Sequence, residues 1–256
     1  RLLAEGVHLV PGAAITRVET RGGETVVSYE AGGRSHQVAT DEILVGIGRA
    51  PNVDGLGLEV AGVRYDRDGV EVNDYLETTN PRVYAAGDIS SRFKFTHTAD
   101  ALARIVIQNA LFFGRKQASA LIVPWATYTS PEIAHTGLYE ADARARGIAT
   151  TTVTVPLHDV DRAILEGEDE GFVKVLLRKG SDQIVGATLV AERAGDMISE
   201  LTLAMVGGLG LGTIAQTIHP YPTQAEVLKK AGDAFSRTRL TPRVKKLFAW
   251  LLGVRR

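Results

Sequence analysis

The chain has 256 residues, of which 45% are hydrophobic and 23% charged, values typical of globular proteins of one or two domains. Its 29 Lys and Arg residues are balanced by 30 Asp and Glu residues, so bulk charge does not favour binding to nucleic acid. The absence of cysteine excludes a disulfide framework, a thiolate zinc site and a cysteine nucleophile within these residues.

The first residues predict a helix end, a glycine cap at Gly6 and then a strand up to residue 10. A basic segment followed by an apolar stretch does not open the chain, so we expect no signal peptide and a cytoplasmic location. Alternating side chains predict short strands at residues 14–20, 24–30 and 34–38, separated by glycine turns. The compact apolar run at residues 43–47 predicts a buried strand.

A second group of elements follows residue 70. Residues 83–86 predict a buried strand that ends at Gly87 and Asp88. Residues 98–113 predict a helix, because apolar side chains recur there at every third or fourth position, and Gly114 is its expected cap.

From residue 121 the pattern changes to strands that are often adjacent in sequence. Strands are expected at residues 125–130, 151–158, 171–178 and 184–191, and helices at residues 138–146, 194–207 and 223–235. This mixture predicts an α+β domain that begins near residue 120. Residues 201–218 carry no formal charge and could be taken for a membrane span, but the glycines at 207 and 208 favour a buried helix that ends there.

The tail, residues 237–256, contains seven Lys or Arg residues and no acid. The preceding residues therefore carry a net charge of −8, because the tail contributes +7 to a total of −1. Apolar residues repeat at helical spacing over 242–252, opposite a basic face: Val244, Leu247, Phe248, Leu251 and Leu252. Three partners for this stripe remain open: the protein's own dimer, an anionic membrane surface, or another protein.

Self-sufficient catalytic motifs are absent from the sequence, including the P-loop, H-E-x-x-H and G-x-S-x-G. One G-x-G-x-x-A occurs at residues 210–215, but it follows a helix instead of a strand, so we read it as structural. The six histidines show no metal-ligand spacing, and no metal site is expected.

Gly87 and Asp88 form the first candidate site, because they end a predicted buried strand. Ligands of open α/β sheets bind outside the carboxyl ends of strands, where a carboxylate can accept hydrogen bonds from a polyol. A helix begins about ten residues later, and its amides could face an electron-rich ring edge. From the residues alone, capping of a turn by Asp88 is an equal alternative.

Five segments in order resemble the FAD-dependent pyridine nucleotide-disulfide oxidoreductases, most closely the mercuric reductase-like and dihydrolipoamide dehydrogenase-like members. Residues 79–88 resemble the second flavin motif, and residues 48–52 resemble the junction between the NAD(P)H and FAD domains. Residues 124–137, 184–200 and 219–226 resemble the opening, middle and closing loop of the interface domain.

The resemblance implies an α+β interface (dimerisation) domain preceded by partial FAD- and NAD(P)-binding α/β segments. The expected boundaries are 1–47 for the NAD(P)H-domain remnant, 48–120 for the closing part of the FAD domain, 121–235 for the interface domain and 236–256 for the tail. It also implies homodimerisation, FAD and NAD(P)H as cofactors, and these cofactor contacts: Gly87, Asp88, Phe95, Thr96, His97 and Pro222.

The closing loop departs from the disulfide-reductase pattern at Tyr221. The family places a His–Glu proton shuttle there; here Tyr221 precedes Pro222, and Glu226 keeps the place of the Glu. A tyrosine is a poor base at neutral pH, so we expect Tyr221 to donate a hydrogen bond as a catalytic residue beside Glu226, although it could instead fill the core. Thr223 and Glu226 also match a capping box, which is a structural explanation for both.

The family's first flavin fingerprint, its Cys-x4-Cys disulfide and its NAD(P)H fingerprint are not among these residues. We therefore expect the C-terminal portion of a flavin-dependent NAD(P)H oxidoreductase that is inactive alone. In the full-length enzyme, hydride would pass from NAD(P)H through FAD and an upstream disulfide to an unknown acceptor. The alternative is a stand-alone dimerisation or binding module without flavin.

Overall fold

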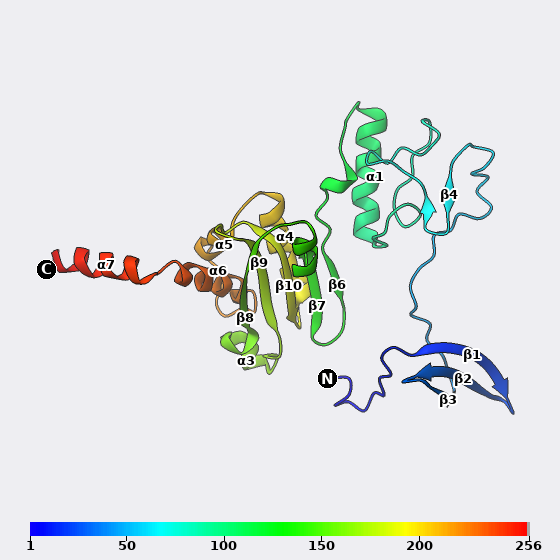
Figure 1. Cartoon of the computed structure of the whole chain (residues 1–256), viewed down its shortest axis with the longest axis horizontal. Helices are drawn as coiled ribbons and strands as arrows, with labels where there is room; N and C mark the ends of the chain where they lie inside the picture. Colours follow the sequence, from blue (N-terminus) through cyan, green and yellow to red (C-terminus); the bar gives the residue numbers. More distant parts are fainter. Residues whose placement is uncertain (255–256) are drawn as a thin grey trace. The chain divides into compact units, whose positions relative to one another are not determined.

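The computed structural model describes residues 1–254, which form two compact units, residues 1–50 and the residues from 51 onward (Figure 1). In the first unit, β1 (Ala14–Arg21), β2 (Glu24–Ala31) and β3 (Arg34–Thr40) form an antiparallel meander. Val18 pairs with Val27, and Val27 pairs with Val38, so their side chains share one face of the sheet. The three strands expected from sequence are confirmed.

The second unit begins with short elements and one long helix. Strands β4 (Tyr65–Asp66) and β5 (Gly69–Val70) pair with each other, and α1 spans Thr96–Leu111. Leu76, Leu102 and Ile105 form a small buried cluster between α1 and the segment before it. A 3-10 turn at Ala118–Ala120 then leads into the larger region.

The larger region is built on a five-stranded antiparallel sheet in the order β6-β7-β10-β9-β8. Its strands are β6 (Trp125–Thr127), β7 (Glu132–Gly137), β8 (Thr150–Pro156), β9 (Phe172–Arg178) and β10 (Ile184–Ala191). The helices are α2 (Glu140–Ala145), α3 (Asp161–Glu166), α4 (Ala194–Val206), α5 (Leu211–Gln216) and α6 (Glu226–Thr238), and the tail forms α7 (Pro242–Val254). The expected α+β class is confirmed.

One face of this sheet is buried beneath α4 and α6. Val173, Val175 and Leu177 alternate along β9 and are fully buried against the helices. From the helices, Leu201 of α4 and Leu228 of α6 enter the same core. The side chains therefore follow the period of two that the sequence shows.

The opposite face of the sheet is only partly covered. Ala143 of α2 packs there against Leu176 and Val185. Gly186 makes this approach possible, because a Cβ at that position would collide with the backbone of Leu138.

Residues 201–218 do not form one continuous helix. Helix α4 ends at Val206, with Gly207 as its C-cap and Gly208 at a φ of +67°, and α5 starts at Leu211. Among residues 1–254, none of the helices combines the length and the apolar character that crossing a membrane requires.

Three expected strands are wrong. Residues 7–10 and 43–47 form no strand, and in the second segment Leu44 is 98% exposed. Residues 83–86 form only one bridge, between Tyr84 and Glu77. An apolar segment becomes a strand only when a neighbouring strand pairs with its backbone along its length. Among the described residues, 7–10 and 43–47 have no such neighbour, and 83–86 have only the one bridge.

The position of the core predicts that the same Leu→Ala substitution changes stability very differently at a buried and at an exposed site. Leu201→Ala should destabilise the five-stranded region by about 2–5 kcal/mol, because it leaves a cavity beneath the sheet. Leu165→Ala, on a side chain 75% exposed on α3, is the matched control and should change stability by less than about 1 kcal/mol. Urea unfolding followed by far-UV circular dichroism measures both; equal losses would contradict this packing.

Candidate functional site

Gly87 and Asp88 lie in a tight turn against the first residues of α1. Gly87 is buried with a φ of +85°, and a Cβ there would come within 3.2 Å of the Cβ of Ala99. The Asp88 carbonyl accepts a hydrogen bond of 2.7 Å from Lys94 Nζ, which ties the loop after the turn to its start. The Asp88 side chain is half-buried.

Helix α1 begins two residues earlier than expected, so Thr96 and His97 belong to its first turn. Its first internal bond runs from the Ala99 amide to the Phe95 carbonyl at 2.9 Å. The amides of residues 96–98 therefore have no acceptor within the helix and are available to a ligand at its N-terminus.

The ring of His97 is held in place by protein groups. Its Nε2 atom lies 2.8 Å from the Pro124 carbonyl oxygen. Its ring stacks on Phe95 with centroids 5.2 Å apart. At the start of α1, the backbone amides of Thr96 and His97 are thus free to contact a ligand, whereas the His97 imidazole is already engaged by protein groups.

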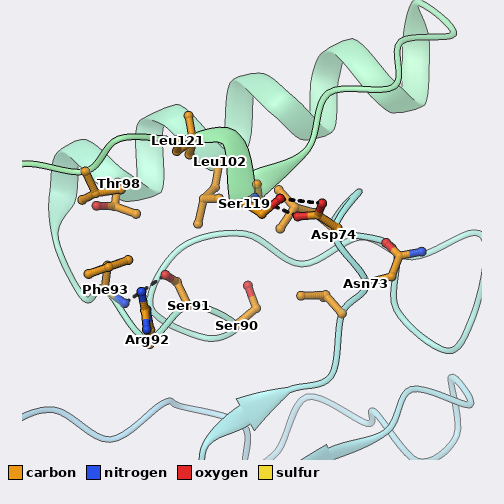
Figure 2. A pocket seen from close by; sticks show the side chains of 14 residues that line it. Asn73, Asp74, Ser90, Ser91, Arg92, Phe93, Thr98, Leu102, Ser119 and Leu121 are labelled. Atoms are coloured by element: carbon orange, nitrogen blue, oxygen red, sulfur yellow. Dashed lines mark hydrogen bonds between the residues drawn. The ribbon is translucent and has the colours of Figure 1, made fainter. Parts of the chain in front are cut away.

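A cavity of about 480 Å³ lies between α1, the loop that follows Asp88 and the segment before residue 121 (Figure 2). Thr98 and Leu102 line it from α1, and Ser90, Ser91 and Phe93 line it from the loop. Ser90 Oγ and Thr98 Oγ1 are buried without a hydrogen-bond partner among the described residues. Buried hydroxyls of this kind need an acceptor or donor from outside the described protein groups.

The same cavity has an ordered acidic edge. The Asp74 carboxylate accepts hydrogen bonds of 2.7 Å from both the amide and the hydroxyl of Ser119 (Figure 2). These bonds lower the pKa of Asp74 below its usual value. The sequence analysis missed this cavity, because its walls are 45 residues apart along the chain at this contact and share no motif.

The closing loop places Tyr221 beside Asp161 at the start of α3. The Tyr221 hydroxyl donates a hydrogen bond of 2.9 Å to Asp161 Oδ2, and the ring is 69% exposed. This bond, together with the negative charges of Asp161 and Glu226, raises the pKa of Tyr221. Tyr221 is therefore no core filler, and it is a still weaker base than an ordinary tyrosine.

Glu226 is the first residue of α6, and the expected capping box is wrong. Ala225 is the N-cap, and the Thr223 hydroxyl donates to the Pro220 carbonyl at 2.8 Å instead of receiving a helix amide. The turn before the helix closes by short-range bonds, such as the Glu226 amide to the Thr223 carbonyl at 3.3 Å, so the side-chain cap is not needed.

The Glu226 carboxylate has one oxygen in use and one without a partner. Oε1 lies 3.7 Å from Lys230 Nζ, whereas Oε2 is buried and accepts no hydrogen bond among the described residues. An unpaired buried acceptor next to Tyr221 can receive a proton or a hydrogen bond from a ligand.

Two further residues, which the sequence analysis did not single out, support this loop. Glu200 of α4 lies 3.1 Å from His219 Nε2, which fixes the start of the loop. The buried Gln224 amide donates to Glu166 at 3.0 Å and also to Glu168. With Asp161, these partners lie 19–60 residues away in sequence, and no local pattern marks them.

Pro222 lies next to a second, smaller cavity of about 330 Å³. Thr223 and Gln224 line this cavity with Arg162 and Arg193. The expected site residues thus fall into two groups: one at the turn before α1, the other where the closing loop meets α3 and α6.

Two family models match the chain. The pyridine nucleotide-disulphide oxidoreductase model matches residues 1–103, and the dimerisation-domain model of the same name matches residues 123–232. A mercuric reductase from Staphylococcus aureus is 36% identical over 92% of this chain and 43% of its own length. A dihydrolipoyl dehydrogenase from Thermus scotoductus is 35% identical over 91% of this chain and 51% of its own length.

Solved structures agree with these matches. The HOCl-induced flavoprotein disulfide reductase RclA of Escherichia coli superimposes with a TM-score of 0.80 at 25% identity, covering 92% of this chain and 53% of that one. LpdA of Mycobacterium tuberculosis gives a TM-score of 0.82 at 27% identity, covering 91% and 50%. The chain belongs to the pyridine nucleotide-disulphide oxidoreductase family, as the sequence resemblance implied. It spans about half the length of the curated relatives it matches.

The Tyr221–Asp161 contact predicts a titration. In Asp161→Asn the pKa of Tyr221 should fall toward its usual range, because the acceptor charge that holds the proton is gone. Since the folded pKa lies above the unfolded one, this contact stabilises the fold below the tyrosine range and loses its effect as pH rises through the folded pKa. NMR titration of the Tyr221 ring carbon measures the shift.

Asp159→Asn is the control for that titration, because it removes the same charge two residues away, on a side chain that is 57% exposed. It should leave the pKa of Tyr221 unchanged. A similar fall in both variants would show that the general field of nearby negative charges, and not the hydrogen bond, sets the pKa of Tyr221.

Proposed function

We propose that this chain supplies the flavin-facing turn and the dimerisation domain of a flavin-dependent NAD(P)H oxidoreductase. In that reaction, hydride equivalents pass from NAD(P)H through FAD and a redox disulfide to an acceptor that these residues do not define. The observation that carries the proposal is the ordered match of both family models, residues 1–103 and 123–232, to one chain. The names of its relatives support the redox class.

The turn before α1 has the properties that FAD binding requires. Gly87 lets a ligand approach the backbone, and the Asp88 carboxylate can accept hydrogen bonds from the ribitol hydroxyls. The free amides at the start of α1, at Thr96 and His97, can donate to the electron-rich pyrimidine edge of the flavin. FAD supplies the two-electron redox chemistry, and these residues hold and orient it.

The closing loop would act on the acceptor. We propose that Tyr221 donates a hydrogen bond to it and that Glu226, through its unpaired Oε2, accepts a hydrogen bond or a proton from the same bound molecule. In the described structure the Tyr221 hydroxyl donates its hydrogen bond to Asp161, so an acceptor must compete with Asp161 for this donor. In the same loop, Pro222 would contact the flavin.

Homodimerisation is part of the proposal. The outward face of α4 and the turn after it expose Leu203 at 68%, Val206 at 67% and Leu209 at 45%. Clustered apolar side chains of this kind mark an interaction surface. An interface of the obligate class would bury more than about 2,000 Å². The matched dimerisation domain supports the same reading.

The remaining assignments rest on the resemblance. Residues 1–47, which include the β1–β3 meander, are proposed as the part of the NAD(P)H domain in this chain. The domain boundaries near residues 120 and 235 stay predictions. The cytoplasmic location also stays a prediction. No feature of residues 1–254 favours the alternative of a dimerisation module without flavin.

Flavin content tests the proposal. In the full-length enzyme, Asp88→Ala should lower bound flavin per polypeptide severalfold, because the ribitol loses a charged acceptor. Asp100→Ala, four residues into α1 and paired with Arg104, is the matched control and should retain flavin. Visible absorbance of the purified proteins measures both. Unchanged flavin in Asp88→Ala would refute the assignment.

The dimer surface gives a second test. Leu203→Glu should convert the dimer to a monomer at micromolar concentration, because a carboxylate would be buried in an apolar interface. Leu165→Glu changes a leucine of similar exposure on α3 and should leave the dimer intact. Sedimentation velocity separates the outcomes; a monomeric unmodified protein would also contradict the proposal.

A further inference from the structure

Helix α7, Pro242–Val254, exposes the apolar stripe that the sequence predicts. The exposed fractions are 53% for Leu247, 51% for Phe248, 42% for Leu251 and 62% for Leu252. The helix is joined to α6 by residues 239–241, and the Thr241 carbonyl accepts its first bond from the Lys245 amide at 2.9 Å. Within residues 1–254, no side-chain hydrogen bond or ion pair links α7 to the body of the protein.

The cations of α7 flank this stripe on both sides. Successive residues of an α-helix are rotated by about 100°, so Leu247, Leu251, Phe248 and Leu252 fall within about 80° of Val244. Arg243 and Lys245 then lie about 100° to either side, one at each edge of the stripe. Trp250 lies near the Arg243 edge, and Lys246 lies on the far side.

The charge of this segment has one sign. Residues 237–256 contain seven cations and no anion, and no acid pairs with Arg243, Lys245 or Lys246 among the described residues. A protein groove that covered the helix would need acids at both edges of an apolar channel. An anionic lipid surface provides negative charge over its whole area and an apolar layer directly beneath it.

We propose that α7 binds the surface of an anionic lipid bilayer, lying in the interface with its apolar stripe toward the acyl chains. Thirteen residues of α-helix extend about 20 Å, which gives α7 enough length to lie along the surface of a membrane. Arg243 and Lys245 can reach the headgroups from the two edges, and Trp250 suits the headgroup level. This inference is independent of the proposed redox function.

Vesicle co-sedimentation of the whole chain tests the proposal. We expect binding to phosphatidylcholine vesicles that contain phosphatidylglycerol and little binding to phosphatidylcholine alone. Raising the salt from about 0.1 M to about 1 M should weaken binding strongly, because the screening length falls from about 10 Å to about 3 Å. In Trp125→Phe, Trp250 is the remaining tryptophan of the two, and its emission should shift to the blue on anionic vesicles.

Two variants separate the contributions. Arg243→Gln/Lys245→Gln/Lys246→Gln should lower the affinity roughly a hundredfold, at about fivefold per cation. Leu247→Glu/Leu251→Glu should abolish binding. The matched control, Arg67→Gln/Arg82→Gln/Arg144→Gln, removes the same charge from other exposed positions and should bind as the unmodified chain does.

Several results would overturn the proposal. These are no binding at low salt, equal binding to neutral vesicles, or equal loss in the charge control. A second copy of the chain is the competing partner. If Trp250 emission is already blue-shifted without vesicles and Leu247→Glu/Leu251→Glu dissociates a dimer that does not bind vesicles, α7 is a dimer contact and the membrane assignment is wrong.

Discussion

The burial of one face of the five-stranded sheet beneath α4 and α6 is the constraint on which the closing loop depends. Leu228 of α6 must pack into the same core as Leu201 of α4, so the N-terminus of α6 is fixed in position. Residues 219–226 connect these two buried helices through α5. Their conformation is therefore set from both ends, and His219, held by Glu200 of α4, anchors the first end. A loop held at both ends can expose 69% of Tyr221 to solvent and still keep the side chain in a fixed position.

The polar contacts of that loop divide its side chains by chemical role. Asp161 accepts a hydrogen bond from the Tyr221 hydroxyl and raises the pKa of the phenol, which excludes proton abstraction by Tyr221 near neutral pH. Glu226 lies nearby with an unpaired oxygen, so its carboxylate can accept a proton, which the Tyr221 phenol cannot. In the disulfide reductases that the chain resembles, a His paired with this Glu shuttles the proton of the substrate thiol. Here the donor and the acceptor lie on separate groups, so in the proposed mechanism the proton path would differ from that of the disulfide reductases that the chain resembles.

The sequence predicts elements well where the chain provides its own partners. Residues 184–191 and α4 appear close to their expected bounds, since their apolar faces pack on each other. Residues 43–47 have the same apolar character but no neighbouring strand among the described residues, and they stay exposed. For the candidate site, the resemblance pointed to the turn at Asp88 and the loop at Tyr221, whose functional roles stay predictions. Asp161 was unpredictable, because a partner 60 residues away leaves no local pattern.

The distribution of buried polar groups shows which part of the chain a ligand would stabilise. The five-stranded region has an extensive core, whereas the region around α1 buries only a small cluster of Leu76, Leu102 and Ile105. Ser90 and Thr98 of that region keep unpaired hydroxyls beside the large cavity. A bound group that satisfied the α1 amides and these hydroxyls would add its binding free energy to a weak local core. Binding of the proposed cofactor would therefore be coupled to the folding of the α1 region far more than to that of the five-stranded region.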